Sequence, residues 1–343
     1  MPEPHKQVMQ QLYKAAQSGN LPLLEDLLAK GARLNKGNIG DKTALHHAAK
    51  GGKLAAVRYL VEKGADKDKC DNGGFFSLSH AAFHGFMDII QYLQEQGSLM
   101  IDGEGRTVLH CAAEGGQLVL AQQLVEQGAD LEATDIGGST ALHSCVVFEH
   151  LAVTEYLVAQ GANKDAADQF GNTALHVAAR EGLLSFVRYL REQGAEVEKV
   201  NAKGQTPLHL AAEHDELEVM QYLLEEGGAD RNKATTDTQD TALHIAAAAG
   251  HHEIVSCLFT HLADLTARNR NGQLPIDVAN NDKIRQLITA EELGRRDHGH
   301  KRAREEGMLT PTPAPPAKKH KGGDEEEEEE EQPSEASEEE EEG

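Results

Sequence analysis

A four-residue pattern, Thr-x-Leu-His, recurs along this chain at a nearly constant spacing, and such a period limits the fold more strongly than composition does. Six copies match the pattern: Thr43–His46, Thr107–His110, Thr140–His143, Thr173–His176, Thr206–His209 and Thr241–His244. An Ala pair such as Ala48-Ala49 usually follows, and a Gly-Ala-Asp triplet or a near relative closes the segment, as at residues 64–66. Each copy is therefore one structural unit, which must stack on its neighbours to bury its apolar face.

The motif His sets a register that extends beyond the six clear copies. The equivalent residues are Tyr13, His46, Ser79, His110, His143, His176, His209, His244 and Asp277, at intervals of 33, 33, 31, 33, 33, 33, 35 and 33. This register predicts nine helix pairs. The two outer pairs read as caps, because terminal repeats need a wettable face and the outward positions of the first pair hold Gln and Lys. The 31-residue and 35-residue intervals shorten a hairpin near residues 98–105 and lengthen the turns near residues 227–239.

The motif, the Ala pair and the Gly-Ala-Asp triplet together resemble the ankyrin-repeat family, whose repeat is a hairpin turn followed by two antiparallel helices. The resemblance implies an all-α solenoid with β-hairpin turns over residues 8–293. It also implies that the motif His and Thr form local hydrogen bonds that brace the hairpin on the helix. Proteins of this family bind other proteins, usually on the concave face, and the resemblance therefore implies a non-catalytic interaction module.

Bulk properties exclude several classes of function. No apolar run approaches the ~18 residues of a membrane span, and the N-terminus lacks the apolar core of a signal peptide. The four cysteines have no paired spacing, which favours a reduced, intracellular environment. The sequence contains no phosphate-binding loop, nucleophile motif or metal-ligand spacing, so we expect no enzyme activity, no cofactor and no metal. We expect a monomer.

Charge is distributed unevenly. Residues 1–293 hold 25 basic and 40 acidic side chains, a net charge of −15. Residues 294–321 hold 8 basic and 3 acidic side chains (net +5), and residues 322–343 hold 14 acidic side chains and no basic ones (net −14). An acidic array with an acidic tail is a poor ligand for phosphate backbones, so direct nucleic-acid binding is not expected.

Apolar residues occupy positions that are normally polar in such a repeat, namely the hairpin tips and the two residues after the Ala pair. The group Ile136, Val147, Phe148 and Phe170 comes from two consecutive repeats and is the predicted contact surface for a protein partner. Arg180 and Glu181 occupy the same two positions in the next repeat. Nearby acidic residues such as Glu114 and Glu213 suit a partner whose apolar segment is flanked by Arg or Lys. Phe75 and Phe83 are either further contact residues or covered parts of an irregular repeat.

The chain after Leu293 is rich in Gly, Pro, Glu and Lys and is predicted to be disordered, with a basic, Pro-rich segment at 294–321 and an acidic tail at 322–343. Two basic clusters resemble a bipartite nuclear-import signal and make an import receptor a candidate partner: Lys301, Arg302 and Arg304, and Lys318, Lys319 and Lys321. They favour a nuclear over a cytoplasmic location. Thr310 and Thr312 precede prolines, and Ser334 and Ser337 lie among acidic residues, so these four are candidate phosphorylation sites.

The sequence thus predicts a nuclear adaptor or scaffold that binds a protein on its ankyrin surface. Two alternatives stay open. The acidic tail suits a chaperone for histones or other basic proteins, and it can equally serve to solubilise the chain or to mask the import signal. Ankyrin repeats combined with an acidic tail are also similar to the NF-kappa-B inhibitor family, which regulates transcription factors.

Overall fold

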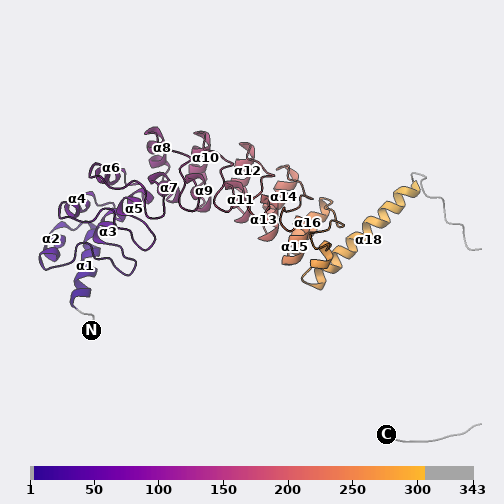
Figure 1. The fold of residues 1–343 in the computed structure, drawn as a ribbon, viewed down its shortest axis with the longest axis horizontal. Coiled ribbons are helices and arrows are strands. Elements are labelled where there is room, and N and C mark those ends of the chain that lie inside the picture. The colour runs from indigo at the N-terminus through magenta and orange to yellow at the C-terminus, as the bar shows by residue number, and fades with distance from the viewer. Residues whose placement is uncertain (1–3, 306–343) are drawn as a thin grey trace, which may run out of the picture. The chain divides into compact units, whose positions relative to one another are not determined.

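The computed structural model describes residues 4–305, and their regular structure is helical (Figure 1). The helices form nine pairs, as the register predicted. The first helices of the pairs are α1 (Pro4–Ser18), α3 (Ala44–Lys50), α5 (Ser77–Phe83), α7 (Val108–Glu114), α9 (Ala141–Val147), α11 (Ala174–Arg180), α13 (Pro207–Glu213), α15 (Ala242–Ala249) and α17 (Pro275–Val278). The second helices are α2 (Leu21–Ala29), α4 (Leu54–Glu62), α6 (Met87–Glu95), α8 (Leu118–Glu126), α10 (Leu151–Ala159), α12 (Leu184–Glu192), α14 (Leu217–Glu225), α16 (His252–Thr260) and α18 (Asp282–Glu305).

Successive pairs pack side by side in chain order. Each first helix contacts the first helix of the next pair, and most second helices contact the next second helix, as α2 does α4 and α8 does α10 (Figure 1). The second helices bury apolar side chains between pairs, with Val57 and Leu60 in α4 and Val187 and Leu190 in α12 fully inaccessible. Cys111 and Cys145 are buried among the small residues of α7 and α9, and burial raises the pKa of the Cys145 thiol to about 12.

The motif explains where each first helix begins. In the α11 repeat, Thr173 has an extended backbone and is the N-cap, and its N–H donates to His176 Nδ1 over 3.2 Å. The Thr173 hydroxyl lies 2.9 Å from the same nitrogen. This reciprocal arrangement satisfies backbone donors that the first turn of a helix leaves without partners. The local hydrogen bonds that the family resemblance implied for Thr and His are confirmed.

The same histidine also reaches the next repeat, which the sequence did not reveal. His176 Nε2 lies 3.0 Å from the carbonyl oxygen of Gln205. Because Nδ1 accepts the Thr N–H, the ring proton is on Nε2 and donates to that carbonyl, so the ring is neutral. Five further pairs repeat the contact at 2.9 to 3.1 Å: His46 with Phe75, His110 with Ser139, His143 with Asn172, His209 with Lys233, and His244 with Gln273.

The hairpins are held by side chains rather than by strand pairing. An Asp or Asn carboxyl or amide oxygen accepts the N–H groups two and four residues later, as Asp135 does from Gly137 and Ser139, both at 2.8 Å. Neighbouring hairpins are joined by one backbone bond, for example from Gln169 N–H to the Gly137 carbonyl at 2.8 Å. The β-hairpins predicted from the family therefore exist as turns, and residues 4–305 contain only two isolated β-bridges, Ile101 with Thr107 and Ala234 with Thr241.

One β-bridge falls in each of the two irregular intervals. The shortened hairpin leaves Leu99, Met100 and Ile101 exposed. In the lengthened one, Thr235 takes the place of the usual Asp or Asn and accepts the Asp240 N–H over 3.1 Å. Backbone hydrogen bonds join each hairpin to the next between residues 40 and 202, and again between Thr238 and Arg270. Within the described residues, no such bond joins the hairpin at 201–205 to the hairpin at 235–240.

The two ends of the array differ from its middle. The outward side chains of α1 are exposed, as predicted for a cap: Gln7, Gln10, Gln11, Lys14 and Gln17. At the other end α17 is a single turn of four residues. The chain divides into two units at Leu293, but α18 continues to Glu305, so residues 294–305 are helical where the sequence predicted disorder. That prediction rested on a composition rich in Gly, Pro, Glu and Lys after Leu293, whereas residues 294–305 contain no Pro and include Arg, Lys, Ala and Glu, which are good helix formers.

Candidate protein-binding surface

Hairpin tips and the C-terminal ends of the first helices line a common surface, as Thr238 and Ala249 do near the lengthened repeat, and this surface is called here the inner face. Val147 is the last residue of α9 and Phe148 is its C-cap, and their side chains are 49% and 47% exposed. Earlier repeats place Gly51 and Gly115 where Phe148 stands. A large ring on this position can only project from the helix end, and this explains why Phe148 is exposed.

Two hairpin tips of the same region also carry large apolar side chains. Ile136 is 69% exposed and Phe170 is 62% exposed. Their backbones are nevertheless fixed, because the Ile136 N–H donates to the Glu104 carbonyl over 3.0 Å and the Phe170 carbonyl accepts the Ala202 N–H over 2.8 Å. The structure thus places all four residues of the predicted contact surface in solvent, on two consecutive repeats.

Phe75 and Phe83 lie in a different environment. Phe75 is half-buried beneath the Arg106 guanidinium, whose central carbon is 3.6 Å from the ring centroid. Its other side meets the His80 ring, with centroids 5.4 Å apart. Phe83 is also half-buried and meets His84 edge to face at 5.2 Å. Four of the six predicted apolar contact residues are thus exposed, and these two are half-buried.

The polar neighbours of the exposed group are of two kinds. Arg180 Nε and Glu181 Oε1 form an exposed ion pair of 2.7 Å on the repeat that follows Phe148. Glu114, one repeat earlier than Val147, is only 7% exposed. Burial raises the pKa of its carboxyl to about 7, against the opposing effect of Arg106. A group that is partly protonated at neutral pH is a weaker anionic contact than its sequence position suggested.

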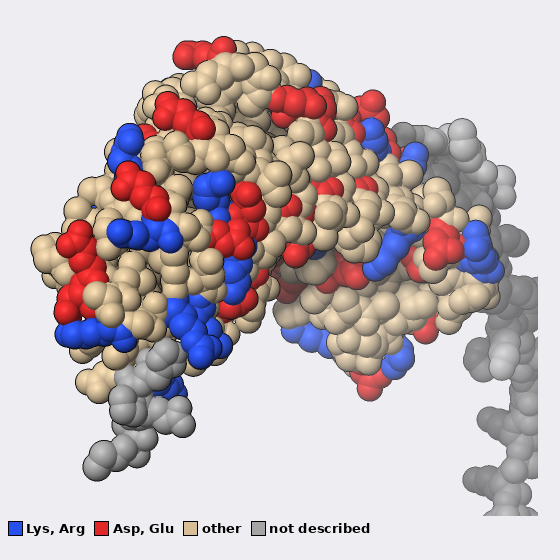
Figure 2. Space-filling view, turned by 60° about the vertical axis from the view of Figure 1, so that its left-hand side comes forward, with Lys and Arg blue, Asp and Glu red and all other residues tan. Residues whose placement is uncertain are grey.

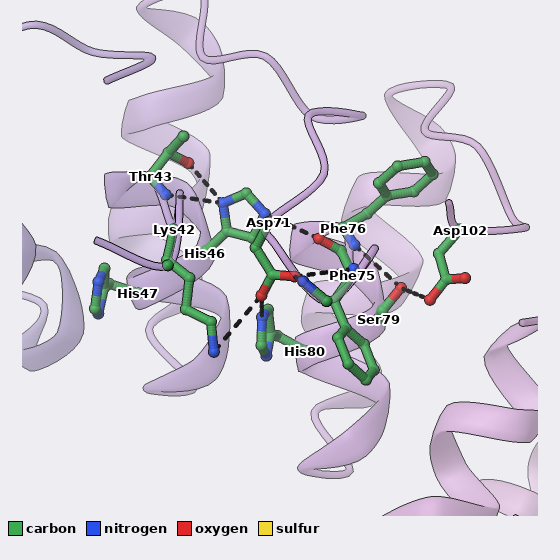
Figure 3. Close-up of polar contacts among 12 residues, drawn as sticks. Lys42, Thr43, His46, His47, Asp71, Phe75, Phe76, Ser79, His80 and Asp102 are labelled. Atoms are coloured by element: carbon green, nitrogen blue, oxygen red, sulfur yellow. Dashed lines mark hydrogen bonds and ion pairs between the residues drawn. The ribbon is translucent and has the colours of Figure 1, made fainter. Parts of the chain in front are cut away.

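The irregular third repeat contains a cluster of polar contacts, shown in Figure 3. Asp71 Oδ2 lies 2.9 Å from His80 Nε2 and 3.5 Å from Lys42 Nζ. Burial favours the neutral carboxyl, but the hydrogen bonds from His80 and from the backbone outweigh it and lower the pKa of Asp71. Burial likewise lowers the pKa of His80 to about 4. His80 is therefore a buried, neutral ring whose Nε2 is hydrogen-bonded to Asp71.

An Asp–His pair invites comparison with a catalytic site, but the nearby hydroxyl is directed elsewhere. Ser79 stands in the register position of the motif His; its hydroxyl accepts the Phe76 N–H and donates to Asp102 Oδ2, at 3.3 and 3.2 Å (Figure 3). Asp102 in turn holds Arg106 Nε at 3.0 Å. These contacts replace the missing inter-repeat histidine bond, so the cluster acts as structural support. Within residues 4–305 no group of three or more His, Cys, Asp or Glu is arranged to hold a metal ion.

The predicted signals of the tail receive no side-chain description. Lys301, Arg302 and Arg304 fall in the last turns of α18, where only the backbone is described. The remaining candidates lie outside the described residues: Lys318, Lys319 and Lys321 of the second basic cluster, and Thr310, Thr312, Ser334 and Ser337. None of the described helices combines the length and hydropathy that a membrane span requires.

Further exposed apolar side chains lie at positions that were not predicted from the sequence. Ile39, at the tip of the first hairpin, is 98% exposed, and Leu99, Met100 and Ile101 are exposed in the shortened hairpin. A signal for Ile39 was available, because it occupies the same repeat position as Ile136. The run at 99–101 could have been noticed because the corresponding loop after α4 reads Asp66-Lys67-Asp68.

Comparison with known proteins agrees with the repeat pattern. The family model for three copies of ankyrin repeats matches residues 12–102, 97–168 and 160–235, and a single-repeat model matches residues 238–270. Among solved structures, the crystal structure of the human ASB11 ankyrin repeat domain is 28% identical, with a TM-score of 0.49, over 58% of this chain and 90% of that one. No curated protein matches the chain significantly.

Proposed function

The chain belongs to the ankyrin-repeat family, and we propose that it is a non-catalytic adaptor that binds a protein partner through Ile136, Val147, Phe148 and Phe170. Ankyrin repeats generally mediate protein–protein interactions. The observation that supports this site is the exposure of four large apolar side chains, between 47% and 69%, over a backbone fixed by hydrogen bonds. Exposed apolar patches with a polar rim are typical of interaction sites, and aromatic anchors tend to contribute most of the binding energy.

The partner that fits this surface has an apolar segment flanked by Arg or Lys. Glu181 is exposed on the repeat that follows Phe148 and Glu213 on the repeat after that one, and both carboxylates can pair with such cations. The Arg180–Glu181 pair is exposed and therefore weak, so a partner's guanidinium can replace Arg180 at little cost. The basic clusters at 301–304 and 318–321 support a nuclear site of action. We propose that phosphorylation at Thr310, Thr312, Ser334 or Ser337 regulates this location.

The test compares partners captured by the full chain with those captured by a Phe148→Ser, Phe170→Ser double variant, using quantitative mass spectrometry. We expect one partner to be lost selectively, with little change in thermal stability, because both rings are about half exposed or more. The matched control is Val119→Ser with Leu262→Ser, which removes two equally exposed apolar side chains from α8 and from the residue pair after α16. A large loss of stability in the Phe variant, or an equal loss of the partner in the control, would contradict the proposed site.

The acidic tail supports a second candidate function, capture of histones or other strongly basic proteins. Residues 322–343 contain 14 acidic and no basic side chains. This function predicts that deletion of residues 322–343 abolishes histone capture while the Phe variant leaves it intact. It also predicts that capture falls steeply with salt, since the attraction is between exposed charges. Capture that survives deletion of the tail argues against it.

A further inference from the structure

A groove lies at the N-terminal end of the array, between α1 and the first hairpin. Its volume is about 710 Å³, and we call it the N-terminal groove. Met9 and Tyr13 are buried in its floor and Ile39 stands almost wholly exposed at its edge. The Tyr13 hydroxyl donates to the Lys36 carbonyl over 3.0 Å and so fixes the hairpin beside α1. The groove is therefore a shaped apolar surface supported by the fold.

The charged residues of the groove are all basic. Lys6, Lys14 and Lys36 line it, each is exposed, and no salt bridge found among residues 4–305 engages any of them. The surrounding repeats share this sign: residues 4–69 hold 12 basic and 6 acidic side chains, a net charge of +6. Residues 70–293 hold 13 basic and 33 acidic side chains, a net charge of −20. Figure 2 shows basic side chains concentrated around the N-terminal end of the array, interspersed with acidic ones.

The backbone at the groove edge lacks a contact that later repeats possess. In the positions equivalent to Ile39, the N–H of Asn72, Gly103, Ile136, Gln169 and Ala202 each donates to a carbonyl of the preceding hairpin. Within the described residues no hairpin precedes Ile39. An extended chain laid along this edge can supply the corresponding carbonyl to the Ile39 N–H, as the preceding hairpin does at those five tips.

We propose that the N-terminal groove binds an extended, acidic segment of a partner protein that carries a large apolar side chain. Its carboxylates pair with Lys6, Lys14 and Lys36, its apolar side chain contacts Met9, Tyr13 and Ile39, and its backbone takes the place of a preceding hairpin. The chain's own acidic tail meets only the charge requirement, since residues 322–343 contain no large apolar side chain. This site is separate from the inner-face group at residues 136–170 and does not depend on the function proposed for it.

The test uses the full chain and four fluorescent synthetic peptides, with binding followed by fluorescence anisotropy. One peptide alternates Glu with Leu, the second alternates Glu with Ser, the third alternates Lys with Leu, and the fourth is residues 322–343. We expect the Glu-Leu peptide to bind most tightly, and its affinity to fall when NaCl is raised from about 0.05 to 0.5 M, because part of the attraction is between exposed charges.

Two variants locate the binding. Lys6→Gln, Lys14→Gln and Lys36→Gln together are expected to weaken the Glu-Leu peptide about tenfold or more, as is Ile39→Ser alone, since each removes part of a charged and apolar contact. The matched control, Lys30→Gln with Lys53→Gln and Lys63→Gln, removes three exposed lysines at the ends of nearby helices. Thermal melting verifies that every variant is folded.

Three results would overturn the proposal. Equal loss of affinity in the two triple variants shows that only net charge matters. Equal affinity for the Glu-Leu and Glu-Ser peptides shows that the apolar floor is not used. Binding of the 322–343 peptide as tight as that of the Glu-Leu peptide assigns the groove to the chain's own tail instead of a partner.

Discussion

The Nε2 atom of His176 lies 3.0 Å from the carbonyl oxygen of Gln205, a residue 29 positions later in the next repeat. One side chain thus caps its own helix through Nδ1 and fastens the following hairpin through Nε2. The motif is therefore a coupling element between neighbours as well as a helix-start signal, and removing it should affect two repeats at once.

We expect His176→Ala to lower the free energy of unfolding by about 2–4 kcal/mol, because it opens a cavity and leaves buried backbone groups without partners. His176 is wholly inaccessible to solvent. Urea unfolding followed by circular dichroism measures the change. The control is His252→Ala, at an exposed position, which should cost less than about 0.5 kcal/mol. Similar losses for the two variants would contradict the coupling role.

Stability should decrease as the pH falls from neutral toward 4. Burial lowers the pKa of His176 and of His209 to about 4, and the same cause lowers the pKa of His46, His110 and His143. An unfolded histidine titrates near 6.5, so between these values the unfolded chain binds more protons and is favoured.

Above about pH 6.5 each neutral ring makes its full contribution to the free energy of unfolding, and this contribution is lost as the pH falls. For His176 or His209 the loss at pH 5 is about 2 kcal/mol. Urea unfolding at a series of pH values between 7 and 5 measures it. The His176→Ala variant, lacking one of the rings, should show a correspondingly weaker dependence on pH. An identical dependence in the variant would show that other groups dominate the titration.

Gly171 should tolerate substitution less well than Gly194, although both have a left-handed backbone, with φ of +76° and +86°. A Cβ at Gly171 would lie 2.6 Å from the Ala202 nitrogen, where the two hairpins join, whereas no atom lies within 4 Å of a Cβ at Gly194. We expect Gly194→Ala to cost about 1 kcal/mol from backbone strain, and Gly171→Ala about 1–3 kcal/mol more from the clash. Chemical denaturation compares the two, and equal costs would show that the hairpins separate easily.

Asp102→Ala should be among the more damaging substitutions in the array. The side chain of Asp102 is fully buried; its Oδ1 accepts the N–H groups of Glu104 and Arg106, and its Oδ2 binds Arg106 Nε and Ser79 Oγ. Removing it leaves a buried cation and a hydroxyl without their acceptor, a loss of about 3–5 kcal/mol. Asp130→Ala, at an exposed turn residue that accepts one N–H, is the control. A small effect at Asp102 would show that Arg106 and Ser79 find new partners.

The repeat sequence predicted the architecture well because the same interactions recur in every copy. The register from Tyr13 to Asp277 located all nine helix pairs, and the inferred exposure of Ile136 and Phe148 followed from their repeat positions. The sequence also contained an unused signal: Asp135, Asp168 and Asn201 recur at the hairpins, and their side chains turn out to hold them.

What the sequence could not predict depends on departures from the period. Phe75 is covered by Arg106, a contact across the shortened interval whose geometry no regular copy displays. The exposure of Glu114 was likewise misjudged: its position is normally open, but it is buried beside Arg106 and Asp102. Asp102 is the ordinary hairpin residue, equivalent to Asp135, and it binds Ser79 only because Ser stands where the motif His is expected.

The gap in the hairpin-to-hairpin bonds between residues 202 and 238 has a consequence for how the array opens. Each repeat contacts only its immediate neighbours, so the cooperativity of unfolding depends on the interface between each pair of successive repeats. The interface between these two repeats has one hydrogen bond fewer than the others, so local unfolding that starts at either end of the array is most readily halted there. The amides on its two sides are accordingly expected to exchange with deuterium as two blocks, and the C-terminal repeats can loosen without disturbing those that present Ile136 and Phe170.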